Sequence, residues 1–195
     1  MNALIVIDVQ NDFCPGGALA VTDGNVIVPG INAAMADYDA VILTQDWHPA
    51  GHSSFASTHG ADVMTLTDMP YGPQVLWPDH CITGTDGAAF HQDLRTDADL
   101  IIRKGFRPAI DSYSAFFEND HTTATGLDGY LRTRGITDLT LAGLATDFCV
   151  NYSAVDAANL GFNVTVNLEL CRGIDLDGSM VTAAQGMKDA GVHLA

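Results

Sequence analysis

Lysine and glutamate are nearly absent from this sequence. It contains two lysines, Lys104 and Lys188, and two glutamates, Glu118 and Glu169, so aspartate supplies most of the formal net charge of −16. Proteins that bind nucleic acid need clustered Lys and Arg, so this charge argues against a nucleic-acid partner. An acidic surface of this kind favours solubility and suits a salty environment.

Long apolar runs are also missing. No segment approaches the roughly 18 apolar residues that a bilayer-spanning helix needs. Residues 1–9 are apolar, but they lack a basic flank and Asp8 interrupts them, so they predict a first strand and not a signal peptide. We therefore expect a cytoplasmic protein without membrane contact. Its length predicts one domain, residues 1–195, and leaves room for a homo-oligomer.

Cysteine pairs at metal-binding spacing are absent as well. The four cysteines are Cys14, Cys81, Cys149 and Cys171, and no two of them form a CxxC pair. This spacing argues against a structural zinc knuckle. A chain of this size without signs of secretion does not need disulfide bonds, so we expect reduced thiols.

Short β-rich apolar runs alternate with helical stretches along the chain. Predicted strands are Ala3–Asp8, Asp39–Thr44, Asp99–Lys104, Asp138–Gly143, Phe162–Asn167 and Gly191–Leu194. Predicted helices are Asn25–Tyr38, Thr123–Arg134, Asp147–Leu160 and Gly178–Ala190, with Gly135, Gly161 and Gly191 at C-cap positions. This alternation predicts an α/β fold whose parallel sheet carries helices on both faces.

Residues 45–98 break that rhythm, because they show no clear helix or strand. The segment is rich in Gly, Pro, Asp, His and Thr, and it carries five of the seven histidines and both tryptophans. Long irregular segments inside compact domains are usually functional or disordered. The concentration of chemically useful side chains predicts a functional segment.

Reactive side chains follow four of the predicted strands. In open α/β sheets, ligands bind beyond the carboxyl ends of the strands. These ends carry the side chains of Asp8, Asp46 with His48, Lys104 and Cys149. Taken singly, each has a structural explanation, such as a capped turn or a packed thiol. Taken together at one sheet edge, they predict an active site.

Cys149 has the strongest local argument for a nucleophile. Thr146 or Asp147 is a suitable N-cap, which places Cys149 in the first turn of a helix. The helix dipole at that position stabilises a thiolate and lowers the thiol pKa, and the free N–H groups can serve an oxyanion. Asp8 is a plausible proton acceptor, and Lys104 would hold Asp8 ionised or stabilise developing negative charge.

Asp46 and His48 form a second constellation. Residues two apart in an extended segment point the same way, so the two side chains can share a ligand. A carboxylate with an imidazole suits Zn²⁺, Fe²⁺ or Mn²⁺. His80 lies in the same long segment and is a candidate third ligand, with His52 and His59 as further candidates.

These residues resemble the nicotinamidase (pyrazinamidase) branch of the isochorismatase-like cysteine hydrolases over nearly the whole chain. The matching stretches are Asp8–Phe13, Pro15–Gly17, Thr44–Pro49, Trp77–Cys81, Arg103–Gly105 and Gly143–Val150. The Asp, Lys and Cys set is shared across the superfamily. The D-x-H-P and W-P-x-H-C stretches distinguish the nicotinamidase branch from the rest of the superfamily, because they build the metal site typical of nicotinamidases.

The resemblance implies a role for each matching residue. The catalytic residues would be Asp8 as base, Lys104 as its charged partner and Cys149 as nucleophile. Ligands to one divalent metal, with Zn²⁺ ahead of Fe²⁺ or Mn²⁺, would be Asp46, His48 and His80, with His52 beside them. The oxyanion hole would use the N–H groups of Ala145 and Cys149, with a cis peptide between Leu144 and Ala145. The substrate pocket would contain Phe13, Trp77 and Tyr113.

The resemblance also implies a fold and a reaction. The fold is a three-layer α/β/α sandwich around a mainly parallel six-stranded sheet. The reaction is hydrolysis of nicotinamide to nicotinate and ammonia through a thioester, in the salvage of pyridine nucleotides, with pyrazinamide as a close analogue. The metal ion would orient the pyridine ring.

Three alternatives remain open from the sequence. A sister cysteine hydrolase acting on another small amide, ureido, carbamoyl or enol-ether substrate would share the catalytic residues without needing the metal ligands. A binding protein that has lost catalysis is disfavoured, because all three catalytic residue types are present. A thiol redox protein is disfavoured, because no resolving cysteine lies near Cys149 in the sequence.

Overall fold

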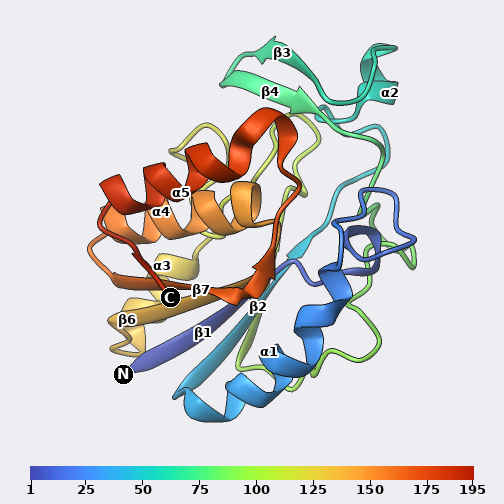
Figure 1. The fold of residues 1–195 in the computed structure, drawn as a ribbon. Helices are drawn as coiled ribbons and strands as arrows, with labels where there is room; N and C mark the ends of the chain where they lie inside the picture. Colours follow the sequence, from blue (N-terminus) through green and yellow to red (C-terminus); the bar gives the residue numbers. More distant parts are fainter.

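The structure is a computed structural model that describes residues 1–195 (Figure 1). Six strands form an all-parallel sheet in the order β5-β2-β1-β6-β7-β8. Their bounds are Asn2–Ile7 for β1, Ala40–Asp46 for β2, Leu100–Lys104 for β5, Asp138–Leu144 for β6, Asn163–Arg172 for β7 and His193–Leu194 for β8. All the predicted strands are present, and β7 continues past its predicted end at Asn167.

Helices cover both faces of this sheet (Figure 1). They are α1 Val28–Ala34, α3 Leu127–Thr133, α4 Asn151–Asn159 and α5 Ser179–Asp189. The connection β1–α1–β2 runs across the sheet in the opposite direction to β5–α3–β6, β6–α4–β7 and β7–α5–β8. Because such crossovers are right-handed, α1 lies on one face and α3, α4 and α5 on the other. The predicted three-layer α/β/α sandwich is confirmed.

The central strands form the core. Every residue of β2 is buried, and so is every residue of β1 except Asn2. This explains why both strands are near-continuous apolar runs without polar alternation. Forty-four buried apolar residues form one contiguous cluster around them. None of the helices combines the length and apolar character that a bilayer crossing requires.

The ends of the helices follow local chemistry. Gly135, Gly161 and Gly191 adopt φ of 69°, 90° and 84°, so the predicted C-caps are confirmed. The predicted start of α3 at Thr123 is wrong, because the helix begins at Leu127. Thr123 donates its N–H and hydroxyl to Asp120 instead, and Thr125 donates its hydroxyl to a backbone carbonyl. Such side-chain bonds compete with the first helical turn.

Residues 45–98 contain more regular structure than predicted. They include the short helix α2, Ala56–His59, and an antiparallel hairpin of β3, Thr65–Met69, with β4, Gly72–Leu76. The hairpin projects beyond the carboxyl edge of the main sheet (Figure 1). Its strands are short, β3 is largely exposed, and β4 contains Pro73. These features weaken the apolar pattern from which a strand is recognised.

Short non-α turns complete the chain. The 3₁₀ turns are Asn11–Phe13, Gly24–Ile27, Met35–Asp37 and Leu176–Gly178, and a π-helical turn spans Thr146–Val150. The predicted helices Asn25–Tyr38, Asp147–Leu160 and Gly178–Ala190 are each divided between an α-helix and one or two of these turns. The π-helical turn follows β6 and carries Cys149 into the carboxyl edge of the sheet.

Candidate active site

The carboxyl edge of the sheet brings together the four side chains that the sequence placed at strand ends. Asp8 follows β1, Asp46 ends β2 and Lys104 ends β5, and β2 and β5 pair Asp46 directly with Lys104. Cys149 follows β6, the other neighbour of β1. Because strand order reverses around β1, a crevice forms at this edge.

Lys104 is the centre of the cluster. Its Nζ lies 2.8 Å from Asp8 Oδ2, 2.5 Å from Asp46 Oδ1 and 3.4 Å from the sulfur of Cys149. It also donates to the carbonyl of Ser112 at 2.9 Å. Burial alone would lower the pKa of Lys104, but the carboxylates of Asp46 and Asp8 outweigh burial and raise it well above its usual value. The lysine is therefore a fixed positive charge.

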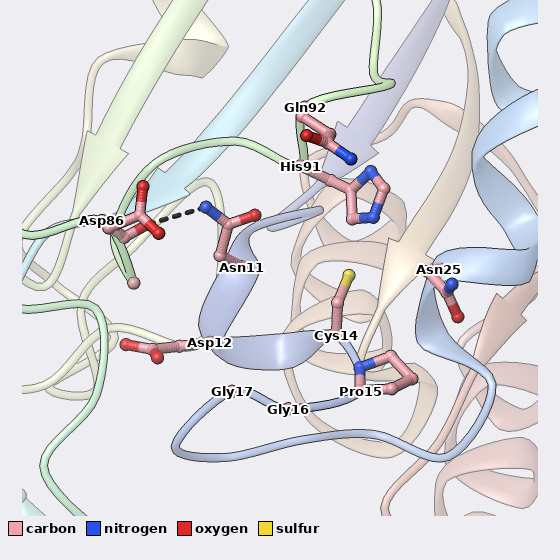
Figure 2. Close-up of a pocket in the computed structure, with 11 residues that line it drawn as sticks. Asn11, Asp12, Cys14, Pro15, Gly16, Gly17, Asn25, Asp86, His91 and Gln92 are labelled. Carbon is pink, nitrogen blue, oxygen red and sulfur yellow. Dashed lines mark hydrogen bonds between the residues drawn. The ribbon is translucent and has the colours of Figure 1, made fainter.

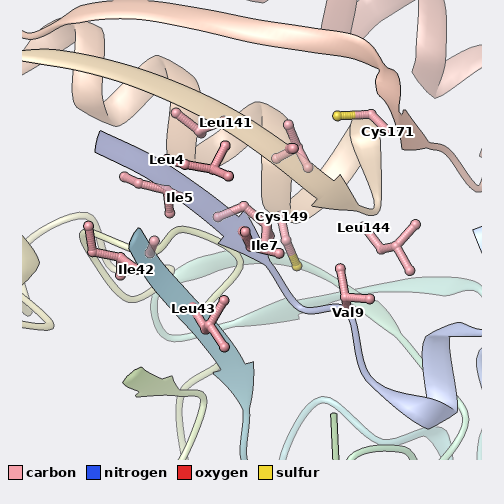
Figure 3. Close-up of a cluster of buried hydrophobic side chains, with 14 of the residues drawn as sticks. Leu4, Ile5, Ile7, Val9, Ile42, Leu43, Leu141, Leu144, Cys149 and Cys171 are labelled. Carbon is pink, nitrogen blue, oxygen red and sulfur yellow. The ribbon is translucent and has the colours of Figure 1, made fainter. Parts of the chain in front are cut away.

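Cys149 is the fourth residue of the π-helical turn Thr146–Val150 and is buried among apolar side chains of β1 and β6 (Figure 3). Its sulfur lies within 4.8 Å of a carboxylate oxygen of both Asp8 and Asp46. The predicted lowering of its pKa by a helix N-terminus is wrong. Burial raises the pKa of the Cys149 thiol well above its usual value, although the charge of Lys104 opposes this effect. The group is a thiol at rest and needs a base.

Asp8 has the environment of such a base. It is fully buried and accepts a hydrogen bond at 2.6 Å from the hydroxyl of Thr44. Burial raises the pKa of Asp8, while the charge of Lys104 acts in the opposite direction. A raised carboxyl pKa narrows its gap to the thiol pKa and makes proton transfer between the two easier.

The turn that leads into Cys149 has an unusual backbone. The Leu144–Ala145 peptide bond is cis, as the family resemblance implies. The N-cap residue is Ala145, and no side chain caps the turn, so the predicted capping by Thr146 or Asp147 is wrong. The carboxylate of Asp147 bonds to residues 174–179 instead. The N–H of Ala145 donates to no backbone carbonyl, so it is free to meet a substrate oxygen.

Asp46, His48 and His80 converge beside this cluster. Asp46 Oδ2 lies 3.6 Å from His48 Nε2 and 3.9 Å from His80 Nε2. The Nδ1 atoms of His48 and His80 bond at 2.8 Å to the carbonyls of Gly105 and Pro78. These bonds fix the tautomer in which each Nε2 offers a lone pair, as in histidines that bind metal. Burial and the charge of His48 lower the pKa of His80 to about 4, which keeps it neutral. The donor set suits a divalent metal.

His52 is arranged differently from these donors. Its ring lies 4.4 Å from that of His48, centroid to centroid, at an interplanar angle of 33°. Nε2 bonds to the carbonyls of Arg107 and Ile110, and Nδ1 bonds to the hydroxyl of Ser54. Since both ring nitrogens have protein partners, His52 supports His48 and offers no free donor atom. His59 bonds to the carbonyl of Ser53 and is exposed.

An apolar pocket opens onto these groups. It is lined by Phe13, Leu19, Asp46, Trp77, His80, Asp111, Tyr113, Ala145, Phe148, Cys149 and Ile174. The predicted pocket residues Phe13, Trp77 and Tyr113 therefore line the same pocket as Cys149. The hydroxyl of Tyr113 accepts the Trp77 indole N–H at 3.0 Å and a Gln74 amide N–H at 2.8 Å, which fixes this wall. Sequence reasoning missed Leu19, Asp111, Phe148 and Ile174, although Phe148 precedes the nucleophile.

A second cavity of about 430 Å³ is polar and open (Figure 2). It is formed by the loop after β1 and by residues 86–92, and Asn11 donates to the carbonyl of Asp86 at 2.8 Å. Burial raises the pKa of its one thiol, Cys14, to about 11. Because this cavity brings no set of reactive side chains together, the apolar pocket is the stronger candidate for the active site.

Comparisons with known proteins show the family of this chain. The Isochorismatase domain matches residues 2–195. A nicotinamidase from Acinetobacter baylyi is 52% identical over 194 residues, which cover 98% of this chain and 90% of that protein. A structure of an Acinetobacter baumanii nicotinamidase/pyrazinamidase is 53% identical with a TM-score of 0.98, covering 99% of this chain and 94% of that one.

A more distant structure carries a metal in its description. It is a pyrazinamidase of Pyrococcus horikoshii in complex with zinc, 33% identical with a TM-score of 0.81, covering 100% of this chain and 98% of that one. The family match spans nearly the whole sequence, and the fold and the clustered strand-end residues agree with it. The chain therefore belongs to the isochorismatase family.

Proposed function

We propose that this protein is a nicotinamidase, which hydrolyses nicotinamide to nicotinate and ammonia in the salvage of pyridine nucleotides. One observation carries the proposal: Cys149, which contacts Lys104 in the catalytic cluster, lines the same apolar pocket as Asp46 and His80 of the three-donor metal group. The names of the Acinetobacter relatives, one a nicotinamidase and the other also a pyrazinamidase, support the same substrates.

The first half of the reaction forms a thioester. Asp8 takes the thiol proton of Cys149 as the sulfur attacks the amide carbon, and Lys104 Nζ, 3.4 Å from the sulfur, stabilises the negative charge. The N–H groups of Ala145 and Cys149 hold the oxyanion. Asp8 then gives its proton to the amide nitrogen as the C–N bond breaks, and ammonia leaves.

The second half returns the free enzyme. Asp8 takes a proton from a water molecule that attacks the thioester carbon, and the C–S bond breaks. The proton on Asp8 passes to the departing sulfur of Cys149, and the product is nicotinic acid, which loses its proton to solvent to give nicotinate. One carboxyl group thus serves as base and acid in turn, which its burial and its partnership with Lys104 favour.

The pocket orients the substrate ring. Phe13 and Trp77 would sandwich the pyridine, and Tyr113 would close one wall. Asp46, His48 and His80 would hold one Zn²⁺, with Fe²⁺ or Mn²⁺ as alternatives, and the named zinc complex of the Pyrococcus relative supports this choice. When bound, the metal supplies a Lewis acid for the pyridine nitrogen. A sister hydrolase acting on a non-pyridine amide would have no use for this donor set.

The net charge and the free cysteines of the chain indicate where the enzyme acts and with what. We propose a cytoplasmic enzyme that acts on a small molecule and needs neither nucleic acid nor membrane. The net charge of −16 supports the absence of a nucleic-acid partner. The four free cysteines are compatible with a reducing compartment.

Ammonia release tests the proposal. Purified protein should release ammonia from nicotinamide and pyrazinamide faster than from a panel of ureido, carbamoyl and aliphatic amides. Cys149→Ala should abolish release, and a chelator should remove it until Zn²⁺, Fe²⁺ or Mn²⁺ is restored. Full activity of metal-free protein in chelator would defeat the nicotinamidase assignment, and activity of Cys149→Ala would defeat the thioester route.

A further inference from the structure

The turn that carries Cys149 holds a second buried carboxylate, which the proposed reaction does not use. Asp147 lies two residues before Cys149 and is 3% exposed. Its Oδ1 accepts the N–H of Ile174 at 3.0 Å, and its Oδ2 accepts the N–H of Asp175 at 2.7 Å. The hydroxyl of Ser179 also donates to Oδ2. Three donors from one distant segment therefore converge on a single side chain.

That segment, residues 173–179, connects β7 to α5 and reaches the pocket through Ile174. The Ile174 side chain lines the pocket together with Phe148 and Cys149. The segment is not relaxed, since Asp175 and Asp177 adopt φ of 58° and 50°. A left-handed conformation is unfavourable for residues with a side chain, so this backbone needs contacts that hold it. The bonds to Asp147 are such contacts.

One wall of the pocket must be held in place and must also be able to move when a substrate enters. Its cavity of about 20 Å³ has room for about one water molecule, which is too little for a pyridine carboxamide. The wall at Trp77 and Tyr113 is buried and tied by side-chain hydrogen bonds. Ile174 is only partly buried, and its backbone is tied to the turn of the nucleophile.

We propose that Asp147 is a positioning residue and a determinant of substrate size. Its carboxylate holds the Ile174 wall at a fixed place relative to Cys149, so it sets how large a ring enters the pocket. The same contacts hold the carbonyl of a bound amide in line with the sulfur. The proposal rests on the proposed function for its substrates but not for its geometry.

The isosteric change Asp147→Asn tests the charge pattern directly. Every partner of the two carboxylate oxygens is a donor, so in either rotamer the amide NH₂ of asparagine faces a donor. Ser179→Ala removes one donor and leaves the two backbone bonds. Asp177→Asn is the matched control, because it makes the same charge change in the same segment, on an exposed side chain outside the bonds to Asp147.

Two measurements separate positioning from folding. The first is kcat and KM for nicotinamide and for the larger quinoline-3-carboxamide. The second is the rate at which iodoacetamide alkylates Cys149 without substrate, followed by mass spectrometry of the Cys149 peptide. We expect Asp147→Asn to raise KM for nicotinamide about tenfold, to lose preference for the smaller ring, and to speed alkylation severalfold. Ser179→Ala should lie between this variant and the wild type, and Asp177→Asn should match the wild type.

The proposal is overturned if Asp147→Asn is alkylated at the wild-type rate and keeps its ring preference, or if Asp177→Asn changes both readouts equally. Should Asp147→Asn not fold, as judged by circular dichroism, Ser179→Ala decides between the same outcomes. If the wild type does not hydrolyse nicotinamide at all, the proposed function fails, and the alkylation rates alone still decide whether Asp147 holds the wall.

Discussion

Gly105 follows Lys104 at the end of β5, and its missing side chain leaves room for the imidazole of His48. A Cβ at this position would lie 2.5 Å from His48 Cε1 and 2.7 Å from Nδ1. The carbonyl of Gly105 is also the partner of His48 Nδ1. Gly105→Ala should therefore displace the His48 ring and weaken the metal site without replacing a ligand.

The losses of stability and of metal affinity can be estimated by comparing Gly105 with Gly60, a glycine of similar backbone conformation. Gly105 has φ of +64° and Gly60 has φ of +60°, but a Cβ at Gly60 meets nothing within 4 Å. Both alanine variants lose about 1 kcal/mol of unfolding free energy to the left-handed backbone. Gly105→Ala adds a collision in a packed site, which costs about 1–3 kcal/mol more. Its affinity for a metal should fall about 10- to 100-fold, as for other changes behind a ligand.

Urea unfolding of metal-free protein and Zn²⁺ competition against a chelating dye measure the two effects. Gly60→Ala should lose about 1 kcal/mol in unfolding free energy and keep its affinity for Zn²⁺. If Gly105→Ala matches Gly60→Ala in both assays, the His48 ring does not need the space above Gly105, and the reasoning is refuted.

Three further predictions concern buried charges and thiols. Lys104→Met should abolish ammonia release and lower the unfolding free energy by about 3–5 kcal/mol, because Asp8 and Asp46 lose their buried cation. Adding Asp8→Asn to this variant should restore part of the stability but no activity. Full stability of Lys104→Met alone would contradict this reasoning. Burial raises the pKa of Asp156, so ionisation of this carboxyl group opposes folding at neutral pH. The effect disappears below the pKa of the group in the unfolded chain, near 3.8. Asp156→Asn should therefore raise Tm at pH 7 but not at pH 3, and an equal shift at both pH values would count against that assignment. Burial raises the pKa of Cys171 to about 12, so iodoacetamide at pH 8 should modify this thiol only after unfolding in guanidinium; rapid labelling of the native protein would show that it is accessible.

Much of the fold could be predicted, because the sheet is buried on both faces. A strand such as β2, with every residue buried, must be apolar throughout, and its pattern is visible in the sequence. The β3–β4 hairpin was missed for the opposite reason. Its first strand is mostly exposed, so its sequence carries little apolar signal and its pairing depends on contacts made in the folded protein.

The sequence was enough to predict which residues come together in the site, but not the pKa values of their side chains. The rule that parallel strands place their carboxyl ends together was enough to group Asp8, Lys104 and Cys149. The pKa of Cys149 was predicted in the wrong direction, because the sequence does not state how completely a thiol is buried. The contacts of Asp147 were missed because its partners lie at residues 174–179, a separation at which no local pattern operates.

Asp46 belongs to two neighbouring groups at once, since Oδ1 faces Lys104 while Oδ2 faces His48 and His80. The free-energy changes of metal binding and proton binding around a closed thermodynamic cycle must sum to zero. If a metal at this carboxylate alters how tightly the Lys104 cluster holds protons, those protons alter the metal affinity by the same factor. A Zn²⁺ titration repeated over a range of pH would thus count the protons that the metal ligands and the Lys104 cluster together gain or release, without any substrate present.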